Sequence, residues 1–406
     1  MINFKSSFYF LGNMIGQAIS LITAIFIIKN ISPEQFGRFS VFTSVGSIIG
    51  SIATLKFELS IAISSSLTQV YEKFNFSIFV SFIMNLLMVS ISLPFLDLGN
   101  GENILLLFFF TICVSLTGIM QQVFLYRENH IYNGLLSIIL SLFNFLFILY
   151  VFKGEALLIK SNVYTNIIAI FVFFVILRFS GFKVTFFSIQ KLKVLFKNNI
   201  EYPKFILPGS IATILLTYFH PILLSLIFSD KEVGVFSFSL RVLLLPTIVI
   251  GAVTSGLLRA KLSKLYFDNN FLQFHIEVVK AIKLLVFAAV FCYIALVLII
   301  NNLSLFINIS KWKGLETTSL FLLFYCVAQF FYVPLSNIAM VLGENKTLLR
   351  YNIIQVIITA ITYMFTYILN FSFYHFLILL SIIFSLFACY TCFKFYYMSI
   401  SKSKIS

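Results

Sequence analysis

The stretch "SPEQFGRFSVF" at residues 32–42 recurs in outline near the midpoint of the chain, as "SDKEVGVFSFS" at residues 229–239. Each copy begins with serine, continues through polar or charged residues, and then reads apolar-Gly-x-Phe-Ser-apolar. Serine caps helices and glycine permits tight turns, so two unrelated turns could converge on this pattern. The place of each copy among the apolar segments of the chain decides between convergence and duplication.

The composition indicates an all-α polytopic membrane protein. Of the 406 residues, 60% are hydrophobic and 10% are charged, and the mean hydropathy is +1.04. A soluble domain could not cover so much apolar side chain with so few charges. Apolar runs of about 20 residues, the length that crosses a bilayer core, recur throughout. The first run, at 7–28, is too long for a signal-peptide core and lacks an A-x-A site, so we expect it to be retained.

We predict about twelve transmembrane helices, at residues 7–28, 38–64, 74–96, 104–126, 131–152, 156–177, 205–228, 234–258, 279–300, 315–341, 348–369 and 374–397. The longest connection divides the chain into a six-helix lobe at 1–178, a basic cytoplasmic linker at 179–204 and a second six-helix lobe at 205–406. The repeated turn follows the first helix of each lobe, which favours a duplication. Parallel repeats of this kind are a transporter architecture with a substrate site between the halves.

The basic residues predict the orientation. With the N-terminus in the cytoplasm, most of the 28 Lys and Arg residues fall in inner loops, and both termini are cytoplasmic. The net charge of +14 would suggest nucleic acid in a soluble protein. Here the anionic inner face of the membrane accounts for it, so we expect membrane lipids and no nucleic acid as partners.

Cysteine and histidine give no sign of a metal or cofactor. Cys389 and Cys392 form a CxxC inside the last apolar segment, where we interpret them as small apolar residues. The four histidines are scattered without metal-ligand spacing. We therefore expect no metal, no cofactor and no catalytic residue.

Lys56 and Glu58 interrupt the second predicted helix, in "SIATLKFELSIAI" at 51–63. Ionisable groups at membrane depth are costly, and they are functional candidates by default. Residues two apart on a helix point to different sides, so we expect no pairing between these two charges. The alternative is that the helix ends near Leu55 and both charges lie at the membrane interface.

Arg241 lies about 10 Å along the eighth helix from Gly234, at about 1.5 Å per residue. A guanidinium group stays charged and binds phosphate oxygens bidentately, so we predict that Arg241 faces a substrate cavity. Arg259 directly follows the predicted helix and could help to gather an anionic headgroup.

Proline and histidine supply further candidates in the second lobe. His220 is a polar group in the outer half of the seventh helix and is a candidate for proton coupling. Proline removes a backbone donor and kinks a helix, either as a static packing feature or as a hinge of a transport cycle. The hinge candidates are Pro208, Pro221, Pro246 and Pro334.

Three stretches resemble the Wzx-type O-antigen and polysaccharide flippases. In that family an outer S-P-E-x-F/Y-G turn leads to a basic-aromatic-Glu triplet, which here is Lys56-Phe57-Glu58, with Lys where Arg is more familiar. "EYPKFILPGSIATIL" at 201–215 and "VGVFSFSLRVLLLPTIVIGAVTSGLL" at 233–258 resemble later parts of the family. Gly209 stands where Ser is common, whereas Arg241 is in a matching place.

The resemblance implies a flippase of the multidrug/oligosaccharidyl-lipid/polysaccharide superfamily, with two six-helix lobes around a central cavity. Such a protein moves an undecaprenyl-diphosphate-linked oligosaccharide, an O-antigen or capsule repeat unit, across the bacterial inner membrane by alternating access for lipopolysaccharide or polysaccharide biosynthesis. It implies a polysaccharide polymerase and a chain-length regulator as partners. We expect Lys56 and Arg241 to bind the headgroup and Glu58 to orient a cation or take part in ion coupling.

Two other functions stay open. An ion-coupled small-molecule or multidrug exporter of the same superfamily shares the architecture, although its cavity would favour acidic groups. A membrane polysaccharide polymerase or ligase has a similar helix count but carries a large outer loop, whereas the outer connections here are short. No nucleophile-base pair or phosphate-binding glycine loop is evident, so we do not expect an enzyme.

Overall fold

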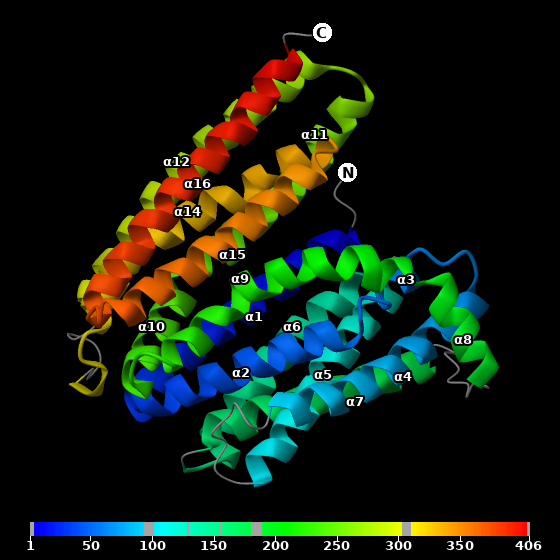
Figure 1. The fold of residues 1–406 in the computed structure, drawn as a ribbon, viewed down its shortest axis with the longest axis horizontal. Coiled ribbons are helices and arrows are strands. Elements are labelled where there is room, and N and C mark those ends of the chain that lie inside the picture. Colours follow the sequence, from blue (N-terminus) through cyan, green and yellow to red (C-terminus); the bar gives the residue numbers. More distant parts are fainter. Residues whose placement is uncertain are drawn as a thin grey trace. The chain divides into compact units, whose positions relative to one another are not determined.

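The computed structural model describes residues 4–92, 101–127, 130–154, 156–179, 189–302 and 310–403, and these residues contain helices and turns without a strand (Figure 1). Within them, 11 helices are long and apolar enough to cross a membrane, or 12 if one bent pair counts as a single span. The predicted fold class, an all-α polytopic membrane protein, is therefore confirmed.

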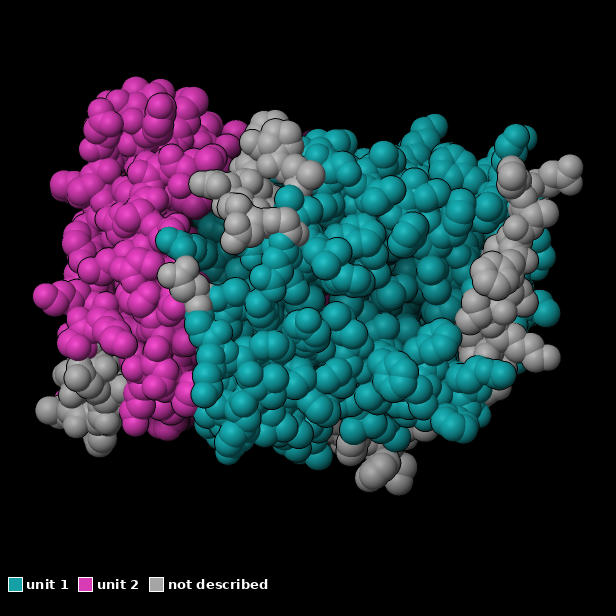
Figure 2. Space-filling view, turned by 90° about the horizontal axis from the view of Figure 1, so that it is seen from below, with its two compact units in different colours: residues 1–24, 38–222 teal, residues 25–37, 223–406 magenta. Residues whose placement is uncertain are grey.

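The chain forms two compact units, shown in different colours in Figure 2. Unit 1 comprises residues 1–24 and 38–222, and unit 2 comprises residues 25–37 and 223–406. Residues 25–37 thus pack with the second half of the chain, although they lie in the first half of the sequence. The predicted lobe boundaries at 178 and 205 stay a prediction, and residues 180–188 of the predicted linker lie outside the described residues.

Unit 1 is built around helix α5, which contacts α3, α4, α6 and α7. Its helices are α1 (Phe4–Asn30), α2 (Pro33–Ala53), α3 (Leu59–Ala62), α4 (Leu67–Ser92), α5 (Gly101–Tyr126), α6 (His130–Leu146), α7 (Leu157–Phe179), α8 (Ile189–Asn198) and α9 (Leu207–Ser225). Of these helices, α1, α2 and α9 also have residues in unit 2. π-Helical turns at Phe147–Val151 and Tyr202–Ile206 follow α6 and precede α9.

Polar side chains join α2, α4 and α5 inside unit 1. A Cβ atom at Gly50 would lie 2.7 Å from the Thr111 carbonyl oxygen, so glycine allows α2 and α5 to approach closely. The Ser115 hydroxyl donates to the Gly50 carbonyl at 2.8 Å, and the Asn85 amide donates to Ser115 Oγ at 3.0 Å. Because these groups are buried, the hydrogen bonds offset part of the cost of removing them from water.

Unit 2 is built around α14, which packs along α16 and contacts α10, α11, α12 and α15 (Figure 1). Its helices are α10 (Asp230–Leu243), α11 (Ala252–Phe267), α12 (Phe271–Asn301), α14 (Leu315–Val341), α15 (Asn345–Ile368) and α16 (Phe373–Ser403). A π-helical turn at Thr247–Gly251 precedes α11, and a short 3₁₀ turn at Ser310–Trp312 precedes α14.

The repeated turn begins a helix in both copies. The Ser32 hydroxyl accepts from the Gln35 amide at 3.3 Å, and the Gln35 side chain accepts from the Ser32 amide at 3.1 Å. At α10, Ser229 and Glu232 make the same reciprocal pair of hydrogen bonds. Each serine thus forms a capping box, which satisfies amide groups that have no acceptor within the helix.

The glycines of the two copies pack against each other within unit 2. A Cβ atom on Gly37 would overlap the Asp230 carbonyl oxygen, and one on Gly234 would overlap the Pro33 carbonyl oxygen. Each such Cβ would also lie 3.0 Å from the backbone nitrogen of the other glycine. The contact is reciprocal, as expected for two related segments about a pseudo-twofold axis. The chain therefore repeats this turn because one copy is the packing partner of the other.

An aromatic cluster surrounds the paired turns. Phe36 and Phe238 lie edge to face with ring centroids 5.4 Å apart, and Trp312 contacts both rings at 5.9 and 4.9 Å. The Trp312 Nε1 group donates to the Ile31 carbonyl at 3.1 Å. Aromatic contacts and a satisfied indole N–H hold the 25–37 segment in unit 2.

Candidate functional site

The second transmembrane segment of unit 1 is broken, and the prediction of one continuous helix at 38–64 is wrong. Helix α2 ends at Ala53 and α3 begins at Leu59. Between them, Leu55 and Lys56 adopt the left-handed region, with φ of 50° and 64°. Non-glycine residues rarely occupy this region, and each costs of order 1–3 kcal/mol there. The break therefore stores strain at a position without glycine or proline.

The break brings Lys56 and Glu58 together. Lys56 Nζ lies 3.7 Å from Glu58 Oε1, with side-chain exposures of 15% and 8%. The prediction that these charges do not pair is wrong, because it assumed helical geometry across the segment. The alternative predicted that the helix ends near Leu55, and α2 does end at Ala53. That both charges lie at the membrane interface stays a prediction, and Glu58 is buried within the protein.

The Glu58 carboxylate is incompletely satisfied. Its Oε2 atom is buried and has no hydrogen-bond partner among the described residues. A buried carboxylate that pairs through one oxygen at 3.7 Å does not recover the hydration that it loses. The Lys56–Glu58 pair is thus costly to the fold, as is often found for groups that are retained for binding or transport.

Aromatic rings of α4 and α8 enclose the turn that holds the pair. Phe57 is fully buried, with ring centroids 4.9 Å from Phe76 and 5.6 Å from Phe196. Leu195 of α8 belongs to the same apolar cluster. Because Phe57 lies between the two charges in sequence, its anchoring fixes the directions from which Lys56 and Glu58 leave the backbone.

Two further basic residues lie beside the break. Lys73 Nζ of α4 donates to the Ser60 carbonyl of α3 at 2.9 Å. Lys191 of α8 forms an ion pair with Glu72 of α4 at 2.7 Å. The sequence predicts both only as inner residues that orient the chain. For Lys191, the available signal is the amphipathic pattern of 189–198, which puts Leu192 and Leu195 on one face and Lys193 and Lys197 on the other.

Arg241 belongs to unit 2, in the last turn of α10. The helix buries Val233, Phe236 and Leu243 within the unit, whereas the Arg241 side chain is exposed. The prediction that Arg241 lies inside a helix is confirmed by the structure. That it binds the same substrate as Lys56 and Glu58, which belong to unit 1, stays a prediction.

The predicted helix at 234–258 is bent, so the kink predicted at Pro246 is confirmed, whereas a role for it as a hinge stays a prediction. Segments 230–243 and 247–267 meet at an angle of 44°, and Pro246 lies between them. Proline cannot donate the helical hydrogen bond, which accounts for a bend at this point. Helix α11 then continues to Phe267, so Arg259 is an exposed residue within a helix. The prediction that Arg259 directly follows the end of the helix is therefore wrong.

The other candidates lie in three different settings. His220 is buried in α9, and Pro221 follows it inside the same helix, directly before the division between the units at 222 and 223. Pro208 is the second residue of α9, directly after a π-helical turn, so it lies within a helix, as predicted, in the first turn. Pro334 is buried within α14. Their roles in coupling or bending stay predictions.

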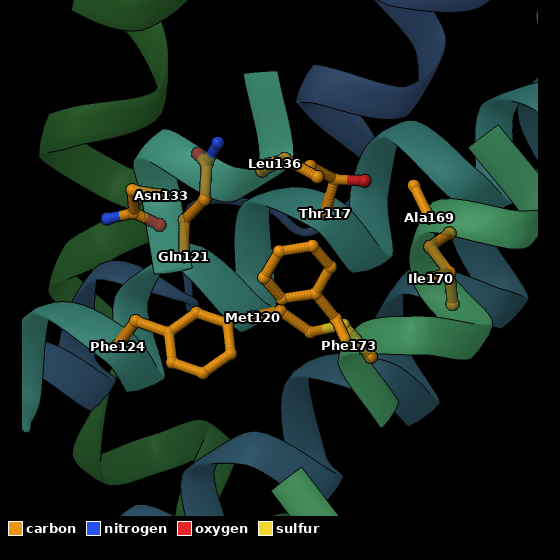
Figure 3. Close-up of a pocket in the computed structure, with 9 residues that line it drawn as sticks. All are labelled: Thr117, Met120, Gln121, Phe124, Asn133, Leu136, Ala169, Ile170 and Phe173. Atoms are coloured by element: carbon orange, nitrogen blue, oxygen red, sulfur yellow. The ribbon is translucent and has the colours of Figure 1, made fainter. Parts of the chain in front are cut away.

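A small cavity between α5, α6 and α7 does not provide a substrate site (Figure 3). Its volume is about 10 Å³, with Phe124 and Phe173 among the lining residues, and a space of that size admits about one water molecule. Thr117 and Asn133 each carry a buried oxygen without a partner among the described residues, so the cavity suits a water and no larger ligand. Among the described residues, no cluster of His, Cys, Asp or Glu could hold a metal ion.

Comparisons with known proteins place the fold. No protein-family model matches the chain, and no curated protein matches it. An inward-facing multidrug resistance MATE family transporter of the MOP superfamily superposes with a TM-score of 0.69 at 16% identity, covering 96% of each chain. Its outward-facing counterpart gives 0.57 at 13% identity, covering 98% of this chain and 95% of that one.

A third structure, a MOP superfamily transporter from Pyrococcus furiosus, gives a TM-score of 0.57 at 16% identity and covers 98% of this chain and 96% of that chain. At such identities the likeness concerns the fold. The chain therefore has the all-helical, two-lobed fold of MATE transporters, the architecture that the sequence resemblance implied.

Proposed function

We propose that this protein is a transporter, and specifically a flippase that moves an undecaprenyl-diphosphate-linked oligosaccharide from the cytoplasmic to the periplasmic leaflet by alternating access. The transporter class is supported by a fold shared with MATE transporters over nearly the whole chain. The flippase assignment is supported by the stretches that resemble Wzx-type flippases. The triplet Lys56-Phe57-Glu58 of the first stretch lies at the break between α2 and α3.

The observation that carries the proposal is the pair of partly exposed Lys56 and buried Glu58 at a strained break in a membrane helix. A diphosphate-sugar headgroup is anionic and hydrophilic, and it cannot cross about 30 Å of hydrocarbon unaided. In the proposed cycle, Lys56 leaves Glu58 and attracts the diphosphate, while Glu58 takes up the coupling cation. When the headgroup is released, Lys56 pairs with Glu58 again. Because the resting pair is poorly satisfied, an anionic headgroup can compete for Lys56 without breaking a strong interaction.

Arg241 would bind the headgroup in the outer half of the membrane, because its exposed side chain lies in the last turn of α10, about 10 Å along the helix from Gly234 near its outer end. Arg259, exposed on α11, would gather the headgroup from the inner side. This assignment uses the proposed topology, with both termini in the cytoplasm and the chain in the bacterial inner membrane. Assembly with a polysaccharide polymerase and a chain-length regulator belongs to the same proposal.

The second candidate is a small-molecule or multidrug exporter of the same superfamily. It is favoured by the names of the structural neighbours, which include a multidrug resistance transporter. The name of the Pyrococcus furiosus structure states that reversed polarity of its binding pocket suggests a different function. By the same reasoning, an excess of basic over acidic groups at membrane depth in this chain favours an anionic substrate over cationic drugs.

The test is surface glycan in a clean deletion strain, with lipid-linked intermediates measured in each leaflet. Loss of long glycan with repeat units retained in the cytoplasmic leaflet is the expected result. Single repeat units in the periplasmic leaflet would instead identify a polymerase or ligase. Unchanged glycan with increased drug sensitivity would identify the exporter.

Complementation by variants then tests Arg241. We expect Arg241→Glu to abolish glycan export at normal protein levels, and Arg241→Lys to restore it partly because lysine keeps the charge but loses the bidentate contact. Lys264→Glu, an exposed charge reversal on α11, is the matched control and should leave export intact. Normal export by Arg241→Glu would remove this residue from the mechanism.

A further inference from the structure

Unit 2 contains a cavity that the proposed transport cycle does not use. Its volume is about 360 Å³, within the range of about 300–1,000 Å³ that is usual for small-molecule sites. It is lined by Ser229, Lys231, Glu232, Val235, Lys313, Gly314, Thr318, Phe373 and Tyr374. These residues come from three chain segments, each at the start of a helix.

The N-termini of α10, α14 and α16 converge on this cavity. Ser229 is the N-cap of α10, Gly314 is the N-cap of α14, and Phe373 is the first residue of α16. The first amide groups of a helix have no acceptor within it, and the helix dipole makes this end positive. Ser229 and Glu232 cap α10, and the Ser372 hydroxyl accepts from the His375 amide at the start of α16. The start of α14 has no side-chain cap, so it is the end that favours an anion.

The N-terminus of α14 has no side-chain cap. Gly314 has a φ of 89° and makes no side-chain capping hydrogen bond. A Cβ atom at this position would lie 2.8 Å from Tyr374 Oη, so a larger residue would be both strained and crowded. Glycine therefore allows Tyr374 to approach the first turn of α14 while leaving the amide groups of that turn uncapped by a side chain.

The charged residues of the cavity are mainly basic. Lys231 and Lys313 line it, and Lys313 is exposed. Glu232 also lines it, but its Oε2 accepts hydrogen bonds from the Ser229 amide at 3.0 Å and hydroxyl at 2.8 Å. Asp230 in the first turn of α10 and Glu316 in the first turn of α14 are the other nearby acids, and neither lines the cavity.

Thr318 supplies an independent sign of a ligand. The residue is fully buried and lines the cavity, yet its Oγ1 has no hydrogen-bond partner among the described residues. An unpaired buried hydroxyl destabilises a fold, so such groups usually have a partner. Because Thr318 has no exposed surface, its side chain must rotate toward the cavity for a ligand oxygen to provide one.

We propose that this cavity binds a phosphate or carboxylate group, carried by a soluble molecule of about sugar size or by a lipid headgroup. Amide groups of α14 and the Thr318 hydroxyl donate to the anion, and Lys231 and Lys313 neutralise it. The proposal does not depend on which substrate the protein transports. In the predicted topology, the site opens at the outer face.

The experiment measures thermal unfolding of the full chain in neutral detergent and phosphate-free buffer, with added inorganic phosphate or glucose 1-phosphate against chloride at equal ionic strength. We expect a saturable rise of Tm with phosphate ligands and none with chloride. We expect Lys313→Gln and Thr318→Val to weaken the apparent affinity at least about 10-fold, whereas Thr318→Ser, which keeps the hydroxyl, retains it. No saturable rise in the unmodified chain would overturn the proposal.

Thr318→Val also separates a binding role from a structural one. Without a ligand this variant should be at least as stable as the unmodified chain, because it removes an unpaired buried hydroxyl. Thr165→Val removes a comparable hydroxyl from unit 1 and should leave the phosphate response unchanged. Equal phosphate responses in Thr318→Val and Thr165→Val would mean that phosphate acts elsewhere.

Nanodiscs distinguish the two sources of the anion. If a lipid headgroup occupies the site, phosphatidylglycerol nanodiscs should suppress the response to inorganic phosphate and phosphatidylcholine nanodiscs should preserve it. If a soluble anion is the ligand, the response should persist in both. Loss of the response in both kinds of nanodisc, with Thr318→Ser behaving like Thr318→Val, would count against the site.

Discussion

Helices α2 and α10 begin alike and end differently. Both start with a serine capping box and place a glycine one turn later, and the two glycines are in mutual contact. Beyond this shared start, α2 breaks at residues 54–58 through left-handed backbone and contains a buried pair of opposite charges. Helix α10 instead ends at a bend of 44° beside Pro246, and the Arg241 side chain before this bend is exposed.

The difference shows which part of the repeat is structural. The start is shared because each copy is the packing partner of the other, so a change in one copy affects both. The breaks belong to different units, and they hold different charges. We therefore expect substitutions in the shared start to act on stability, and substitutions at the breaks to act on function.

The largest effect on stability is expected from the paired glycines. Gly37→Ala or Gly234→Ala places a Cβ atom against a backbone carbonyl that cannot move aside alone, so each should lower the free energy of unfolding by about 3 kcal/mol. The double variant should cost less than the sum, because the first methyl group already separates the helices. Chemical unfolding in detergent micelles measures both.

Gly118→Ala and Gly256→Ala are the matched controls, because a Cβ atom at either position would have no neighbour within 4 Å. In these helix interiors alanine should raise the free energy of unfolding by up to about 1 kcal/mol. If all four variants behaved alike, the reciprocal contact between α2 and α10 would not exist in the folded protein.

Substitutions of Lys56 and Glu58 should have an intermediate effect on the free energy of unfolding. The single variant should lower this free energy, and the double variant should restore or raise it. Lys56→Met leaves a buried carboxylate without a cation and should lower the free energy of unfolding by about 2 kcal/mol. The double variant Lys56→Met, Glu58→Leu removes both charges and should restore or exceed the original stability by about 1–2 kcal/mol. Glycan export should be lost in both.

Export is the outcome that decides the meaning of this pair. A double variant that is stable and still exports glycan would show that Lys56 and Glu58 are dispensable. A double variant that is as unstable as Lys56→Met would show that the pair supports the fold. Either result would contradict a functional reason for retaining a strained, poorly satisfied pair.

The smallest expected effect is at the caps. Ser32→Ala and Ser229→Ala should each lower the free energy of unfolding by about 1 kcal/mol, because each removes one side chain of a capping box. The two losses should be equal within error if the starts of α2 and α10 are equivalent. Threonine at either position should recover most of the loss, and unequal losses would indicate that the copies have diverged at their starts as well.

Most of the helices could be predicted from the sequence, because each transmembrane segment shows its hydropathy locally. The break at 54–58 could not, since "TLKFE" contains neither glycine nor proline, and the left-handed turn is held by Phe57 against Phe76 and Phe196. Thr318 was not a candidate either, because an isolated threonine in an apolar helix gives no sign that its hydroxyl lacks a partner.

The sequence by itself determined that the chain crosses a membrane about twelve times and that its two halves begin with one repeated turn. These properties depend on apolar length and capping residues, which act over a few neighbouring positions. Only the tertiary structure decided that Gly37 meets Gly234, that Lys56 faces Glu58, and that three helix N-termini share one cavity. These arrangements depend on contacts between segments far apart in the chain, and no local pattern specifies them.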